Sequence, residues 1–144
     1  MRATVSVNGE LSDGGSAVVS VFDQGFLYGE GVYETIRTYG GVPFLFDRHT
    51  ARLRRSASLL ALDVPFDDDE LRARVDRTVD AHRPVAEAYV RILLTRGVGE
   101  LSYDPRTCRG PTLVIIVKDF VAPSARAYSE GIALVLAGVR RNHP

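Results

Sequence analysis

The 144-residue sequence contains one cysteine, no tryptophan and no net charge at pH 7, and these absences exclude several classes of protein. A single cysteine, Cys108, cannot form an internal disulfide and fits a reducing compartment. The balance of acidic and basic residues gives no electrostatic reason to expect a nucleic acid or an anionic membrane as partner. No apolar run approaches the roughly 20 residues that cross a bilayer, and the N-terminus lacks a signal-peptide core. We therefore expect a soluble, cytoplasmic protein.

Lysine is almost absent from the sequence. Lys118 is the only one, and arginine carries nearly all of the remaining positive charge. Arginine stays protonated at neutral pH and cannot act as an amine nucleophile. Lys118 follows an apolar segment and is expected to be a solvated charge at a strand end. Schiff-base chemistry would therefore need Lys118 or a lysine from outside this sequence.

Several catalytic motifs are missing as well. The sequence has no G-x-x-x-x-G-K-[ST] phosphate-binding loop, and its glycines do not form a dinucleotide-binding fingerprint between a strand and a helix. No serine lies in a nucleophile elbow. The three histidines are scattered along the chain, so we expect no metal site.

The most informative stretch is residues 23–39, where three glycines and two tyrosines lead into a strand-like segment. Six of the eight residues from 32 to 39 are β-branched or aromatic, a composition typical of a strand. Alternation places Tyr33 and Arg37 on one face of this strand and Glu34 on the other. A glycine bend followed by a rigid strand that presents tyrosine and arginine is suited to a binding site. An ordinary hairpin with tyrosines in its core is the alternative.

The rest of the hydrophobic pattern predicts a mixed α/β domain, with a β-sheet and two flanking helices. The first helix is expected to begin after the cap residue Asp47, and the second after Asp67 and to end before Pro84. The inward residues of the first helix are expected to be Leu53, Ser56, Ala57 and Leu60. Strands are expected over residues 4–8, 17–22, 32–39, 42–46, 88–95 and 112–117.

The end of the sequence suggests a domain boundary. Ile132–Ala137 has the pattern of a new apolar strand, and no partner strand follows it in the sequence. We therefore expect one small α/β domain over residues 1–120, a linker over 121–131 and the start of a second, truncated domain over 132–144.

Arginine and tyrosine are the remaining candidates for a site. Tyr33 and Arg37 share one strand, Tyr89 and Arg91 share another, and Arg52 lies on a helix. Arginine binds phosphate or carboxylate through two parallel hydrogen bonds, and tyrosine hydroxyls orient such anions. The pattern therefore predicts a small anionic ligand, although each arginine alone could equally be a solvated or salt-bridged charge.

Several short motifs together resemble one family across most of the chain. The motifs are Phe26–Arg37, His49-Thr-Ala-Arg52-Leu53, Ser56-Ala57, Tyr89-Val-Arg91, Thr95-Arg-Gly-Val-Gly99 and Asp104-Pro105. This combination resembles the class IV aminotransferases, the fold-type IV pyridoxal-phosphate enzymes. They include branched-chain and D-amino-acid aminotransferases and aminodeoxychorismate lyase.

The resemblance implies the small N-terminal domain of the D-amino-acid aminotransferase-like fold, a homodimer, and pyridoxal 5'-phosphate bound between two domains. Arg52 would hold the cofactor phosphate. The substrate pocket would be lined by Tyr28, Tyr33, Tyr89 and Arg91. Tyr103 would lie in the loop that reaches into the neighbouring subunit's site.

The same resemblance places the Schiff-base lysine a few residues beyond Arg140-Arg141-Asn142, just past Pro144. Lys118 does not match it. The Tyr89-x-Arg91 pair favours a branched-chain amino acid with 2-oxoglutarate, because the loop at 101–104 lacks the arginine and histidine of the D-amino-acid type. Aminodeoxychorismate lyase and D-amino-acid aminotransferase activity are the alternatives within the same family. A non-catalytic, dimerising binding module that lacks the lysine is an alternative of another class.

Overall fold

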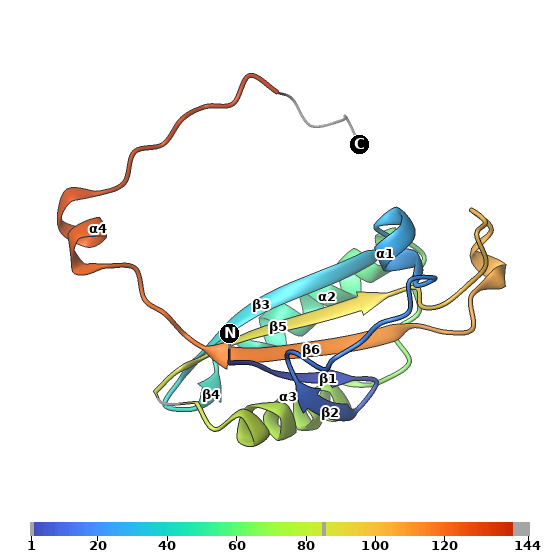
Figure 1. Ribbon diagram of the computed structural model, residues 1–144, viewed down its shortest axis with the longest axis horizontal. Coiled ribbons are helices and arrows are strands. Elements are labelled where there is room, and N and C mark those ends of the chain that lie inside the picture. Colours follow the sequence, from blue (N-terminus) through green and yellow to red (C-terminus); the bar gives the residue numbers. More distant parts are fainter. Residues whose placement is uncertain (1, 85, 140–144) are drawn as a thin grey trace.

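A six-stranded antiparallel sheet in the order β2-β1-β6-β5-β3-β4 organises the chain (Figure 1). The computed structural model describes residues 2–84 and 86–139. Along the chain the elements are β1 (Thr4–Val7), β2 (Glu10–Asp13), α1 (Gln24–Tyr28), β3 (Gly31–Tyr39), β4 (Val42–Pro43), α2 (Phe46–Leu59), α3 (Asp68–His82), β5 (Ala88–Thr95), the 3-10 turn η1 (Pro105–Thr107), β6 (Thr112–Asp119) and α4 (Ala125–Glu130). None of the described helices is long and apolar enough to cross a membrane.

Helices α2 and α3 cover one face of the sheet, and the hydrophobic core lies between this helical layer and the sheet. Alternate residues of the central strands point into this core, as Ile36, Ile92 and Ile115 show with exposures of 1% each. Leu53 of α2 and Val75 of α3 meet them from the helical layer. The intervening strand residues face the other way, and no described helix packs on that side. We call it the open face.

The helix boundaries follow local capping chemistry. Asp67 caps α3 as expected, since its Oδ1 accepts a hydrogen bond from the backbone N–H of Glu70 at 2.7 Å. The expected cap at Asp47 is wrong, because α2 begins one residue before it and Leu45 is the N-cap, without a side-chain bond. Leu60 does not belong to the inward stripe. It is 42% exposed, because α2 ends at Leu59.

Two expected strands differ in the structure. Residues 17–22 form no strand, and Val18 is 79% exposed. A β-branched composition supplies no ladder by itself, because every strand needs a neighbour for its backbone hydrogen bonds. The strand expected over 42–46 is shortened to Val42–Pro43, since Pro43 has no N–H to donate and α2 begins at Phe46.

The C-terminal segment follows β6 away from the sheet (Figure 1). The expected linker contains the short helix α4. The strand expected over Ile132–Ala137 is not formed, because these residues pair with no strand of the described chain and Leu136 is fully exposed, at 100%. The Arg140–Asn142 motif and His143 lie outside the described residues.

Candidate functional site

The glycine bend positions Tyr28 and the start of β3. Asp23, 2% exposed, accepts a 2.8 Å bond from the N–H of Gly25 through Oδ1 and a 2.9 Å bond from the hydroxyl of Thr95 through Oδ2. A Cβ on Gly25 would come within 2.4 Å of Thr95 Cγ2, so the bend can approach β5 only with glycine there. Helix α1 then ends at Gly29, whose φ of +72° turns the chain into β3.

A small pocket lies beside this bend. Its volume is about 160 Å³, and Tyr33, whose side chain lies on the open face, is one of its lining residues. The lining residues are Gly25, Gly29, Gly31, Val32, Tyr33, Leu93 and Thr95. The glycines therefore leave room next to the first tyrosine of the strand.

The register of β3 and β5 brings three of the expected site residues together on the open face. Thr35 pairs with Arg91 and Arg37 with Tyr89, so these four residues share one face with Tyr33. The guanidinium carbon of Arg91 lies 4.6 Å from the centre of the Tyr33 ring. The hydroxyl of Tyr89 is 3.4 Å from Thr35 Oγ1, a long and weak contact that leaves it able to bind another group.

Further cations lie on the same face. The guanidinium carbon of Arg37 lies 3.9 Å from the ring centre of Phe120, and Lys118 Nζ lies 4.9 Å from that of Tyr89. The Nε atoms of Arg37 and Arg91 are buried and have no hydrogen-bond partner among the described residues. Lys118 was expected to be only a solvated charge. Its place beside Tyr89 follows from the β5–β6 register, which the sequence does not give.

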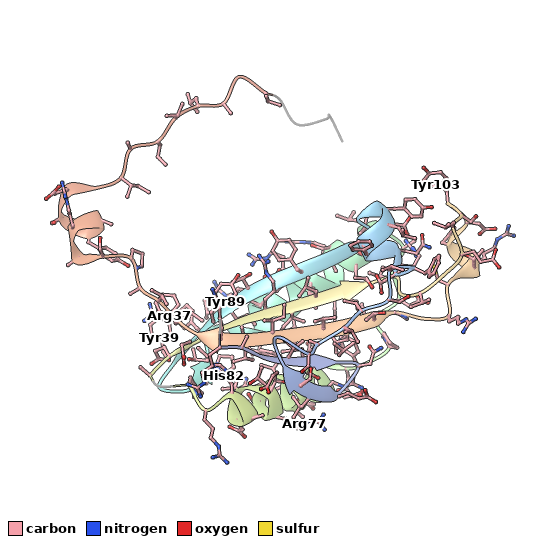
Figure 2. All side chains as sticks on the ribbon, viewed as in Figure 1. Arg37, Tyr39, Arg77, His82, Tyr89 and Tyr103 are labelled. Carbon is pink, nitrogen blue, oxygen red and sulfur yellow. The ribbon has the colours of Figure 1, made fainter. Side chains whose placement is uncertain are left out.

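The tyrosines form a row along the sheet rather than one cluster. Figure 2 shows Arg37 and Tyr89 at one end of the sheet and Tyr103 beyond the other. Tyr103, 83% exposed, lies in the loop after β5, and its ring centre is 4.8 Å from that of Tyr28 in the same chain. The expected site residues thus form two groups, Tyr28 with Tyr103 at the bend and Tyr33 with Tyr89 and Arg91 along β3 and β5.

Arg52 belongs to the helical side of β3. Its Nε donates to Glu34 Oε1 at 2.6 Å and its Nη2 to Oε2 at 2.5 Å, and His49 Nδ1 lies 2.8 Å from Oε2. Glu34 and Tyr33 alternate along the strand, so Arg52 and Tyr33 are on opposite sides of the sheet. Because β4 pairs only with Thr38 and Tyr39 at the end of β3, residues 31–37 lie along an edge of the sheet.

The carboxylate of Glu34 is ionised at neutral pH. Burial of its side chain, 5% exposed, would raise its pKa, but the hydrogen bonds from Arg52 and His49 outweigh this effect and hold the pKa below its usual value. Glu34 in turn raises the pKa of Arg52. The side chain of Arg52 remains 56% exposed, so its charged guanidinium is both oriented by Glu34 and accessible to solvent. Glu34 is the site residue that the sequence analysis missed.

Comparison with known proteins identifies the domain. The chain matches a branched-chain aminotransferase structure from Thermoproteus uzoniensis, solved with norvaline, at a TM-score of 0.74 and 31% identity, over 84% of this chain and 42% of that one. It matches the Escherichia coli branched-chain amino acid aminotransferase at a TM-score of 0.77 and 26% identity, over 88% and 43%. The antiparallel sheet with helices on one face is thus the N-terminal domain of the fold-type IV aminotransferases.

Sequence comparison leads to the family. The model for amino-transferase class IV matches residues 31–144. A putative branched-chain-amino-acid aminotransferase of Methanocaldococcus jannaschii is 39% identical over 95% of this chain and 46% of its own length. The aminodeoxychorismate lyase of Bacillus subtilis is 33% identical over 97% of this chain and 47% of its own. The chain belongs to the class IV aminotransferase family, and it spans about half the length of these curated relatives.

Proposed function

We propose that this chain is the N-terminal part of a pyridoxal-phosphate-dependent aminotransferase that moves an amino group between a branched-chain amino acid and 2-oxoglutarate. The observation that carries the proposal is the meeting of Tyr33, Tyr89 and Arg91 on the open face of β3 and β5. The guanidinium of Arg91, whose buried Nε has no hydrogen-bond partner among the described residues, and the weakly bonded hydroxyl of Tyr89 are donor groups suited to carboxylates.

Arg52 is suited to hold the phosphate of the cofactor. Its guanidinium is permanently charged, is oriented by the ionised Glu34 and is more than half exposed at the sheet edge. When bound, pyridoxal phosphate supplies the electron sink for chemistry at the substrate's α-carbon. The motif resemblance places the lysine that attaches the cofactor just beyond Pro144, and Lys118 does not match that lysine.

Different residues of the open face would bind different groups of the substrate. Tyr89, with Thr35 beside it, orients the α-carboxylate by hydrogen bonding. Arg91 meets the second carboxylate of glutamate or 2-oxoglutarate, and its packing against the Tyr33 ring also leaves an apolar surface for a branched side chain. One pocket could therefore accept both substrates of the reaction.

Homodimer formation is also part of the proposal. Tyr103 is almost fully exposed at the tip of its loop, together with Leu101 at 70%. Large apolar side chains at such a position are suited to contact with a second subunit. The loop of one subunit would then complete the substrate pocket of the other.

Aminodeoxychorismate lyase activity is the second candidate. The similarity to the Bacillus subtilis lyase supports it, because that relative matches almost the whole chain. The two candidates share the proposed cofactor site and differ in the substrate that meets the open face.

An assay of the complete protein that contains this chain tests the proposal. With pyridoxal phosphate present, leucine, D-alanine and aminodeoxychorismate are offered separately, with 2-oxoglutarate as acceptor for the two amino acids. The proposal predicts glutamate formation from leucine at the highest kcat/KM. Conversion of aminodeoxychorismate alone would assign the lyase, and no turnover of any of the three would contradict an enzymatic function.

A further inference from the structure

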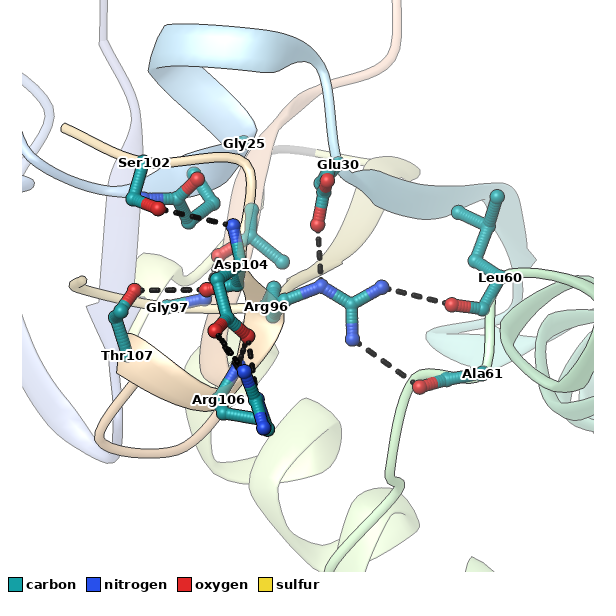
Figure 3. Close-up of polar contacts among 12 residues, drawn as sticks. Gly25, Glu30, Leu60, Ala61, Arg96, Gly97, Ser102, Asp104, Arg106 and Thr107 are labelled. Carbon is teal, nitrogen blue, oxygen red and sulfur yellow. Dashed lines mark hydrogen bonds and ion pairs between the residues drawn. The ribbon is translucent and has the colours of Figure 1, made fainter. Parts of the chain in front are cut away.

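One arginine joins the two parts of the candidate site at the end of the sheet. Arg96 directly follows β5, and its side chain is 16% exposed. Its Nε donates to the carboxylate of Glu30, its Nη2 to the carbonyl oxygen of Leu60 at 2.7 Å and its Nη1 to that of Ala61 at 3.1 Å (Figure 3). One guanidinium thus makes contacts in two directions.

The first contact fixes the glycine bend. Glu30 lies between Gly29, where α1 ends, and Gly31, where β3 begins. Besides the side-chain pair, the backbone N–H of Arg96 donates to the carbonyl of Glu30 at 3.1 Å. The link between Tyr28 and Tyr33 is therefore held to the end of β5 at two points.

The second contact fixes the end of α2. Arg96 donates to the carbonyls of Leu60 and Ala61, the two residues that directly follow α2. Its positive charge also interacts favourably with the C-terminal end of the helix dipole. The same helix carries Arg52 nearer its middle, where Glu34 is its link to β3.

We propose that Arg96 is a positioning residue, which sets the direction of α2, and hence of Arg52, relative to the bend that carries Tyr28 and Tyr33. The buried side chains of α2, among them Leu53 and Ala57, hold the helix against the sheet, and the contacts of Arg96 add a polar tie just beyond its C-terminal end. The proposal rests on the proposed function of Arg52 in binding a phosphate. A lysine could pair with Glu30 but, as a point charge, could not span both carbonyls as well.

The test compares binding of pyridoxal phosphate with binding of pyridoxal, which lacks the phosphate, to the complete protein. Arg96→Gln should raise the dissociation constant of pyridoxal phosphate about tenfold and leave that of pyridoxal nearly unchanged, measured by absorbance titration below the unfolding temperature. The matched control is Arg74→Gln, which breaks an Arg–Glu pair on α3 away from the site and should leave both constants unchanged.

Two further variants separate positioning from simple stabilisation. Glu30→Gln keeps the bonds to α2, so it should raise KM for the amino acid while pyridoxal phosphate binds as in the wild type. Arg96→Lys keeps the charge beside Glu30 and should lose phosphate-dependent affinity. If Arg96→Gln and Arg96→Lys lower the melting temperature but bind pyridoxal phosphate like the wild type, the positioning role is refuted.

The proposed phosphate-binding role of Arg52 can be tested separately from the positioning role of Arg96. Arg52→Gln should abolish the preference for pyridoxal phosphate over pyridoxal. If it does not, Arg52 is not the phosphate ligand and both proposals fall. If Arg52→Gln has this effect and Arg96→Gln does not, only the role of Arg96 is overturned.

Discussion

At the scale of single residues, Glu34 determines what Arg52 can do. A long arginine on an exposed helix surface usually samples many rotamers, and ordering it costs conformational entropy. Here a buried carboxylate holds two of its nitrogens before any ligand arrives. Such preorganisation lowers the entropic cost of binding an anion.

Replacing Glu34 by glutamine should therefore weaken cofactor binding without removing Arg52. We expect Glu34→Gln to raise the dissociation constant of pyridoxal phosphate about fivefold, because a neutral amide orients the guanidinium less firmly. Absorbance titration of the complete protein measures this effect. Glu10→Gln, on the exposed edge strand β2, is the control, and equal affinities in all three proteins would contradict the account.

The same pair makes a prediction about pH. Because the pKa of Glu34 is lower in the folded than in the unfolded chain, its ionised form stabilises the fold above the unfolded pKa. This stabilisation is lost as the pH falls through the folded pKa. The melting temperature of the wild type should therefore exceed that of Glu34→Gln at pH 7, and the difference should shrink below about pH 4.5. A difference independent of pH would exclude an ionised Glu34.

Arg91 makes a prediction about substrate choice. Arg91→Ala should raise KM for glutamate by about tenfold or more and change KM for leucine far less, because only glutamate brings a second carboxylate to the open face. Steady-state kinetics of the complete protein with each donor provides the measurement. Equal changes for the two amino acids would remove Arg91 from this role.

At the scale of secondary-structure elements, the glycine bend depends on close contact with β5. Gly25 lies where a Cβ would meet Thr95 Cγ2 at 2.4 Å. A Cβ added to Gly15, in the turn after β2, would meet no atom within 4 Å, and Gly15 has no positive φ. The two glycines are therefore a matched pair for testing whether this contact is required.

Gly25→Ala should destabilise the fold by about 1–3 kcal/mol, because the added methyl forces the bend away from β5. Gly15→Ala should change stability by less than about 0.5 kcal/mol. Thermal or urea denaturation of the complete protein would measure both. A Gly25→Ala protein as stable as the Gly15→Ala protein would show that the bend is not tightly packed in solution.

The elements also show how far local sequence predicts this fold. Alternation correctly predicted β5 and both faces of β3, and a capping-box pattern correctly predicted the cap of α3 at Asp67, because these signals lie within a few residues. The strand at 17–22 was wrong, since pairing depends on a distant partner that composition does not reveal, and residues 132–137 form no strand within the described chain. The meeting of Tyr33, Tyr89 and Arg91 depends likewise on strand register. The two Tyr/Arg strands and the motif resemblance pointed to a shared site, but neither gave the register.

Glu34 shows the same limit within the site. Its position in β3 was predicted to face away from Tyr33, and the structure agrees. Its contact with Arg52 could not be predicted, because it depends on how α2 packs across the sheet. The burial of Glu34 between Arg52 and His49 depends on tertiary packing, whereas the sequence shows only that Glu34 is a carboxylate in a strand.

At the scale of the whole molecule, the proposed function requires that polypeptide outside this chain complete the site. The chain spans 46% and 47% of two curated relatives, and the tail after β6 exposes its apolar residues. The open face carries three cations, Arg37, Arg91 and Lys118, beside aromatic rings. In such a site, the residues of this chain would orient the substrate and the cofactor phosphate, and polypeptide outside it would supply the rest of the site.

The most direct test of this account follows the absorbance of the complete protein with pyridoxal phosphate. The account predicts a band above about 400 nm that leucine removes and 2-oxoglutarate restores, with restoration impaired in Arg91→Ala and the band weakened in Arg52→Gln. A band that leucine leaves unchanged, or one unaffected by both substitutions, would contradict the assignment of the open face and of Arg52.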